Sequence, residues 1–92
     1  MLFVALLKAR PGTLQERIAR RMAWQVPQEG GETVAEYWLQ TPDPAAVVVF
    51  KADHIGQIWA GFAGWDDFFD ISIYPATTAQ EGLELLKQMM PG

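Results

Sequence analysis

An unbroken apolar run opens the chain and constrains its fold more than any other feature. Residues 1–7 are all apolar, and Pro11-Gly12 follows shortly afterwards. A run of this length without alternation is typical of a strand that is buried on both faces, and the Pro-Gly pair ends it. Residues 45–50 form a second such run. The sequence therefore predicts a sheet whose strands 1–8 and 45–50 are covered on both sides.

Two further segments, 33–41 and 69–74, alternate along the chain, as half-buried strands do. Pro75 is expected to close the second of them. The residues expected on the more polar faces are Val34, Glu36, Trp38 and Gln40 in the first segment and Asp70, Ser72 and Tyr74 in the second. These two segments are predicted to be edge strands.

Three amphipathic helices are predicted between and after the strands. The first covers residues 14–25, the second starts at a cap formed by Asp53 and stops near Gly64, and the third follows Thr78. Capping-box spacing occurs twice, in the pairs Thr13 with Glu16 and Thr78 with Glu81. The apolar stripes consist of Leu14, Ile18 and Met22 in the first helix, Ile55, Ile58, Trp59 and Phe62 in the second, and Leu83, Leu86 and Met90 in the third.

The order of elements is β-α-β-β-α-β with a terminal helix, which predicts an α+β fold of the ferredoxin-like type in a single domain, residues 1–92. In this fold the first and third strands lie at the centre of the sheet. Both crossover helices cover the same face, so about five large apolar side chains remain on the other face. Burying them is worth roughly 8 to 15 kcal/mol. A homodimer joined sheet to sheet would cover them, and the alternative is that the terminal helix folds over this face.

The chain resembles a known superfamily along nearly its whole length. The resemblance rests on Met1 to Leu7, on Glu36-Tyr37-Trp38, and on the segment from Trp65 to Pro75, Trp-Asp-Asp-Phe-Phe-Asp-Ile-Ser-Ile-Tyr-Pro. These motifs are similar to the small dimeric α+β-barrel proteins, and within them to a bacterial and archaeal group of unknown function. The resemblance implies a dimeric barrel but no particular activity, because the superfamily spans oxygenases, isomerases and sensors.

The formal net charge of −4 divides unevenly along the chain. Residues 1–21 hold five of the seven basic residues and one of the eleven acidic ones. Most of this positive charge lies on the first helix, opposite its apolar stripe, in the group Arg17, Arg20, Arg21 and Trp24. We interpret the group as a solvated helix face, with an anion or nucleic-acid surface as the alternative. A sequence pI near 4.7 argues against nucleic acid.

Several classes of chemistry lack the residues they need. The chain has no cysteine, and His54 is its one histidine, so no metal site and no cofactor are expected. His54, at the start of the second helix, is either a general base or a solvated turn residue. The sequence has no basic export signal and no 18-residue apolar run, which predicts a cytoplasmic protein without a membrane span.

A candidate site is predicted where the polar faces of the two edge strands meet in a dimer. Glu36, Trp38 and Gln40 would approach the same cavity mouth as Asp70, Ser72 and Tyr74, and His54 completes the candidate ligand-binding set. The alternative is that these are ordinary water-facing residues. Trp65 is expected to guard a pocket or to anchor the partner, and Asp66-Asp67 is read as a turn or as half of a metal site.

The function predicted from these features is a homodimeric small-molecule-binding module with a cavity between the two sheets, taking a small apolar ligand. The alternative is a cofactor-independent oxygenase or isomerase on the same fold, in which Glu36, Asp70, Tyr74 or His54 moves protons. Whether the protein is an enzyme stays open at this point.

Overall fold

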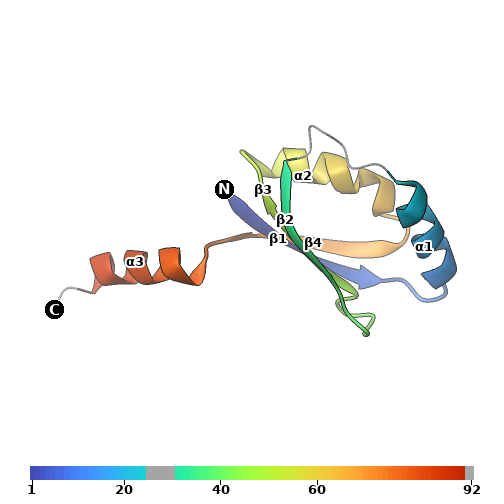
Figure 1. Ribbon diagram of the computed structural model, residues 1–92, viewed down its shortest axis with the longest axis horizontal. Helices are drawn as coiled ribbons and strands as arrows, with labels where there is room; N and C mark the ends of the chain where they lie inside the picture. Colours follow the sequence, from blue (N-terminus) through green and yellow to red (C-terminus); the bar gives the residue numbers. More distant parts are fainter. Residues whose placement is uncertain (25–30, 91–92) are drawn as a thin grey trace.

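The computed structural model describes residues 1–24 and 31–90 of the chain. Four strands and three α-helices follow the predicted order, with one turn of 3-10 helix between α2 and β4 (Figure 1). Their bounds are β1 Leu2–Ala9, α1 Leu14–Ala23, β2 Glu32–Trp38, β3 Ala46–Lys51, α2 Ile55–Phe62, the 3-10 turn Ala63–Trp65, β4 Phe69–Ala76 and α3 Ala79–Met89.

The four strands form one sheet in the order β2-β3-β1-β4, and every neighbouring pair is antiparallel. The two unbroken apolar runs are therefore the central strands, and the two alternating segments lie at the edges. Helices α1 and α2 lie on one side of this sheet (Figure 1). The order and the layers confirm the predicted ferredoxin-like α+β fold.

The helix face of the sheet carries the core. In β1 the alternate residues from Phe3 to Ala9 are buried, and the register places Ala5 beside Val48 of β3 and Ile73 of β4. The segment after α2 and the first residue of β4 complete this core with three buried aromatic side chains, Trp65, Phe68 and Phe69. The core is thus concentrated under α2 and the start of β4.

In the part of the chain that the structure describes, no helix lies over the other face of the sheet, which we call the open face (Figure 1). Its centre consists of five large apolar side chains, which the register brings into rows: Leu2, Val4 and Leu6 of β1 beside Val47 and Val49 of β3. Each of them is half-buried. This is the uncovered surface that the apolar runs predict.

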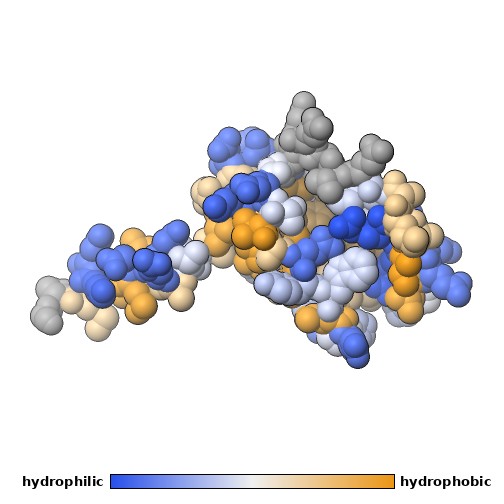
Figure 2. Space-filling view, viewed as in Figure 1, coloured by the Kyte–Doolittle hydropathy of each residue, from blue (hydrophilic) through white to orange (hydrophobic). Residues whose placement is uncertain are grey.

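Helix α3 projects away from the sheet and does not cover the open face (Figure 1). The alternative in which the terminal helix folds over its own sheet is therefore wrong. Apolar residues of α3 lie at the surface beside charged ones (Figure 2). The large apolar residues of α3 and its end are all more than half exposed: Leu83, Leu85, Leu86, Met89 and Met90.

The ends of three elements differ from the sequence expectations. Pro75 lies inside β4 opposite Phe3 instead of closing the strand, because an edge strand tolerates a residue without an N–H. Helix α2 begins after His54 and not after Asp53. The Thr78 cap is confirmed, since its hydroxyl accepts from the Glu81 N–H at 3.0 Å. The Thr13 hydroxyl instead donates to the Arg10 carbonyl at 2.7 Å, so it does not cap α1.

Candidate functional site

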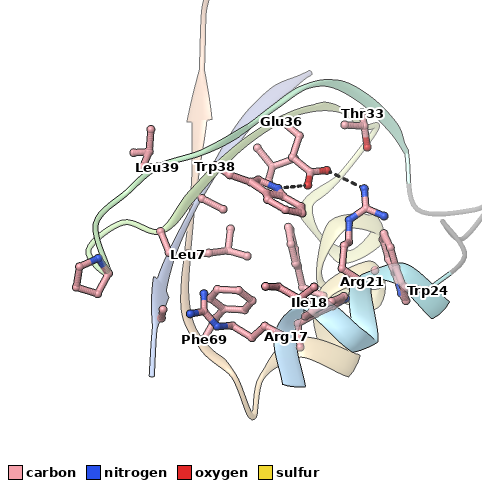
Figure 3. Close-up of a pocket in the computed structure, with 18 of the residues that line it drawn as sticks. Leu7, Arg17, Ile18, Arg21, Trp24, Thr33, Glu36, Trp38, Leu39 and Phe69 are labelled. Atoms are coloured by element: carbon pink, nitrogen blue, oxygen red, sulfur yellow. Dashed lines mark hydrogen bonds and ion pairs between the residues drawn. The ribbon is translucent and has the colours of Figure 1, made fainter. Parts of the chain in front are cut away.

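A pocket of about 690 Å³ lies between α1 and the helix face of the sheet (Figure 3). Its floor and walls come from β1, β2, β3, the β2–β3 connection, α2 and the start of β4. The side chains facing it are mostly apolar or aromatic. Residues contributed by the sheet, α2 and the 3-10 turn include Leu7, Ala46, Val48, Phe50, Ile58, Phe62, Trp65 and Phe69. Helix α1 with its C-terminal cap contributes Leu14, Arg17, Ile18, Arg21 and Trp24.

Helix α1 turns its arginines toward the protein, which the sequence analysis did not predict. The Arg20 guanidinium lies 3.9 Å from the centre of the Phe68 ring, and Trp24 packs edge-on against Trp65 at 5.8 Å between centroids. In contrast, Met22 is 83% exposed. The interpretation of the basic stripe as a solvated face is therefore wrong. Guanidinium groups stack on aromatic faces, so an arginine stripe can form the inner side of a helix.

Arg20 fixes α1 to the connection between α2 and β4. Its two terminal nitrogens donate to the two carboxylate oxygens of Asp67 at 2.7 and 2.9 Å, and one of them also donates to the Gly64 carbonyl at 2.7 Å. These hydrogen bonds from Arg20 lower the pKa of Asp67 below its ordinary value of 3.8 and raise the pKa of Arg20. Asp67 is thus part of a structural ion pair. Asp66 and Asp67 lie in a turn, which is the first of the two interpretations given for them.

Acidification is expected to loosen this attachment. Because the folded-state pKa of Asp67 is lowered, the stabilisation is present above its unfolded value and is lost as the pH falls through the folded value. Asp67→Asn is expected to lower the melting temperature at pH 7 and to flatten its decline as the pH falls below about 4, the ordinary range of an aspartate pKa. Thermal unfolding followed by circular dichroism at a series of pH values measures both. If the melting temperatures of the wild type and of Asp67→Asn fell with the same slope in that range, the result would contradict a stabilising role for the Arg20–Asp67 ion pair.

A second arginine joins α1 to the opposite side of the pocket. Arg21 Nη2 lies 3.4 Å from Glu36 Oε1, and the Trp38 indole N–H donates to Glu36 Oε2 at 2.6 Å (Figure 3). Glu36 and Trp38 both come from β2, so this chain of contacts links α1 to the edge of the sheet across the pocket. The contacts hold the Glu36 carboxylate in one orientation.

Arg17 differs from its neighbours on α1. Its guanidinium carbon lies 5.4 Å from the centre of the Phe69 ring, at the floor of the pocket. Its Nε is buried and has no hydrogen-bond partner in the described residues. The pocket thus contains a cationic group with unused hydrogen-bonding capacity.

The predicted set of site residues is divided between the two faces of the sheet. Glu36 and Trp38 pair with Val48 and Ala46 of β3, which face the helices, and Gln40 also lines the pocket. The three β4 residues instead share the open face with β1: Asp70 lies beside Lys8, Ser72 beside Leu6 and Tyr74 beside Val4. Within one chain, the two polar edges therefore lie on opposite faces of the sheet and do not share a cavity mouth.

The remaining candidates also lie elsewhere. His54 is exposed at the start of α2, and Asp70 forms an ion pair with Arg10 at 3.0 Å. Trp65 is 7% exposed at the base of the pocket, so it neither guards an entrance nor projects toward a partner. No group of three or more potential metal-ligating side chains occurs within residues 1–24 and 31–90.

Sequence reasoning missed the central feature of this pocket, the inward arginines of α1. One signal for them was present, since Arg17, Arg20, Arg21 and Trp24 share a stripe. A tryptophan within a basic stripe indicates a surface that is not simply solvated.

Comparison with known proteins identifies the chain as a member of a family. Residues 1–90 match the family described as "Domain of unknown function (DUF3303)", and the protein belongs to it. No curated protein matches the sequence.

A solved structure shares the fold. It is 5-chloro-2-hydroxyhydroquinone dehydrochlorinase from Burkholderia phenoliruptrix AC1100, in complex with 2,5-dihydroxybenzoquinone. The two chains are 16% identical, and the match covers 88% of this chain and 98% of the other with a TM-score of 0.66. The structural match supports the fold that the motifs indicate, and the family match supports the family of unknown function. In the described part of the chain, no helix has the length and apolar character that crossing a bilayer requires.

Proposed function

We propose that the protein is a small-molecule-binding module whose ligand site is the pocket between α1 and the helix face of the sheet. The observation that carries this proposal is the pocket itself. Its volume of about 690 Å³ falls within the range of about 300 to 1,000 Å³ that small-molecule sites occupy. Its lining is mainly apolar, with Arg17, Arg21 and Glu36 placed among aromatic side chains, which is the composition such sites have.

The location of this pocket differs from the location expected from the sequence. We predicted a cavity between two sheets, whereas the pocket of a single chain lies on the helix side. The similar dehydrochlorinase, solved with 2,5-dihydroxybenzoquinone, supports small-molecule binding on a frame of this shape. Its low sequence identity gives no support for the same reaction here.

The geometry does not favour the alternative function, in which side chains of the protein transfer protons to or from a substrate. Of its four candidate groups, Glu36 alone lines the pocket, where Arg21 and Trp38 hold it. Asp70 and Tyr74 lie on the open face and His54 lies outside the pocket. We therefore assign binding, and not a reaction, to this site.

We also propose that the chain, as one domain of residues 1–92, forms a homodimer through the open face. The accessible surface is 6786 Å², about 1,400 Å² more than the roughly 5,400 Å² typical of a monomer of this mass. The radius of gyration is 15.5 Å, where a compact chain of this length has about 12 Å. A standard interface buries about 800 Å² on each partner. The excess accessible surface is therefore large enough for one interface of standard size.

Helix α3 supports the same assembly. An isolated helix of 11 residues is marginal in water, and α3 exposes an apolar stripe that includes Leu83 and Leu86. Burial of this stripe against a second copy would supply packing that α3 does not receive from its own sheet. A cytoplasmic location agrees with the absence of cysteine and remains a prediction.

Filling the pocket is expected to weaken ligand binding at least tenfold. Gly61 of α2 lines the pocket, and a Cβ built there meets nothing within 4 Å, so Gly61→Leu should project into the cavity without disturbing the helix. The probe is N-phenyl-1-naphthylamine, a neutral aromatic dye whose fluorescence rises in apolar sites. We expect micromolar binding to the wild type and at least a tenfold loss in the variant, since one misplaced side chain of this size removes most of the dye's contacts.

The matched control is Gly64→Leu. Gly64 also has open space at its Cβ but does not line the pocket. This variant should bind the dye as the wild type does. Equal binding by wild type and Gly61→Leu would refute the proposed site, and native mass spectrometry of freshly purified protein would show whether a natural ligand is retained.

A further inference from the structure

We propose that the natural ligand of this pocket is a flat, largely apolar molecule with a single anionic group, and that Arg17 binds that group. This inference rests on the proposed function and adds the chemical class of the ligand. It is carried by the difference between Arg17 and the other arginines of α1.

The charges around the pocket do not balance. Arg21 is paired with Glu36 at 3.4 Å, and Arg20 is paired with Asp67 outside the pocket lining. Arg17 has no carboxylate within ion-pair distance in the described residues. Among residues 1–24 and 31–90, the lining therefore carries one positive charge without a carboxylate partner.

The surroundings of Arg17 favour binding of an anionic group to its guanidinium. Its Nε is buried without a hydrogen bond, and the group lies over the Phe69 ring at 5.4 Å. A guanidinium always carries its charge and offers five N–H donors in a planar fork. Leaving the buried Nε donor unpaired beside apolar side chains is costly, whereas a carboxylate or sulfonate oxygen satisfies it with a strong charge-assisted hydrogen bond.

The walls favour a flat molecule. Trp38 extends from β2 into the pocket on the side opposite Phe69 and Arg17 (Figure 3). Phe62 and Trp65 add further aromatic surface. Aromatic rings present extended faces on which a planar conjugated system stacks. In the described part of the chain, Arg17 is the one pocket cation without a carboxylate partner. Ligands with several charges, such as nucleoside di- and triphosphates, are disfavoured because their additional negative charges would meet apolar walls and the carboxylate of Glu36.

Two dyes that differ by one charge test the proposal. The anionic probe is 8-anilinonaphthalene-1-sulfonate, and the neutral probe is N-phenyl-1-naphthylamine, which has the same ring system without the sulfonate. In Arg17→Gln, which keeps a good helix former, we expect the anionic dye to bind about tenfold to a hundredfold more weakly. The neutral dye should bind as it does to the wild type.

Two further variants keep the charge effect separate from folding. Arg17→Lys retains a cation and should recover most of the affinity for the anionic dye. Arg10→Gln removes an equal charge at a position paired with Asp70 and outside the pocket, so both dyes should bind normally. Circular dichroism spectra of all variants should match the wild type.

The outcomes distinguish this proposal from the proposed function. If Gly61→Leu blocks both dyes but Arg17→Gln weakens neither or weakens both equally, the pocket binds small molecules and the assignment to Arg17 is wrong. If Gly61→Leu leaves both dyes bound, the pocket is not the site and both proposals fail.

Discussion

Replacing Trp65 with alanine is expected to destabilise the protein by about 3 to 5 kcal/mol, a large part of the roughly 5 to 15 kcal/mol that stabilises a typical domain. Trp65 is 7% exposed, and its ring lies 5.8 Å from Trp24, 6.3 Å from Phe68 and 6.1 Å from Phe69, centroid to centroid. Arg20 also lies 5.7 Å from it. One side chain therefore joins α1, the α2–β4 connection and β4.

Urea unfolding followed by circular dichroism measures this loss. Trp59→Ala is the matched control, because Trp59 is 45% exposed on α2 and its removal should cost well under half as much. Destabilisation of the two variants by the same amount would contradict the central place of Trp65 in the core.

Replacing Leu6 with lysine is expected to convert the dimer to a monomer. Leu6 lies on central strand β1 and faces the open side, between Val47 of β3 and Ser72 of β4. In a twofold symmetric interface the substitution places two lysines in the contact. An uncompensated buried charge costs about 3 to 5 kcal/mol, so the dimer dissociation constant should rise by at least a thousandfold.

Light scattering after size exclusion at micromolar concentration measures this change, with a dimer expected for the wild type and a monomer for Leu6→Lys. Gln15→Lys, which adds the same charge on the exposed side of α1, should remain dimeric. A monomeric wild type, or a variant that stays dimeric, would refute the sheet-to-sheet interface. The pocket lies within one chain, so dye binding should survive in the monomer.

The strand order could be predicted because the hydrophobic pattern of each strand indicates whether one or both of its faces are buried. Residues 1–8 and 45–50 show no alternation, as central strands require, while residues 33–41 and 69–74 alternate. The five apolar residues of the open face follow from the same pattern. These features depend on local periodicity alone.

The orientation of α1 could not be predicted from its periodicity. Leu14, Ile18 and Met22 form an apolar stripe, and the usual rule buries such a stripe. In this protein Arg17, Arg20 and Arg21 face inward, because aromatic rings and carboxylates from distant segments give each guanidinium a surface to contact. The acceptor Asp67 is 47 residues away from Arg20 in the chain, so no local pattern reveals the pairing.

The separation of the predicted site residues onto two faces of the sheet could not be foreseen for a similar reason. Alternation shows that Glu36 and Trp38 share one side of β2 and that Asp70 and Tyr74 share one side of β4. It does not show which side of the sheet each set occupies. The register decides this, and β2 also has an irregularity between Thr33 and Ala35 that shifts its pairing with β3. Non-local pairing therefore separates two groups that look equivalent along the chain.

A crystal structure of the protein grown with 8-anilinonaphthalene-1-sulfonate tests the central claim most directly. Our account predicts that the rings of the dye lie between Trp38 and Phe69, with the sulfonate within hydrogen-bond distance of the Arg17 guanidinium. Dye located on the open face of the sheet or along α3, with the pocket between α1 and the sheet empty, would contradict it.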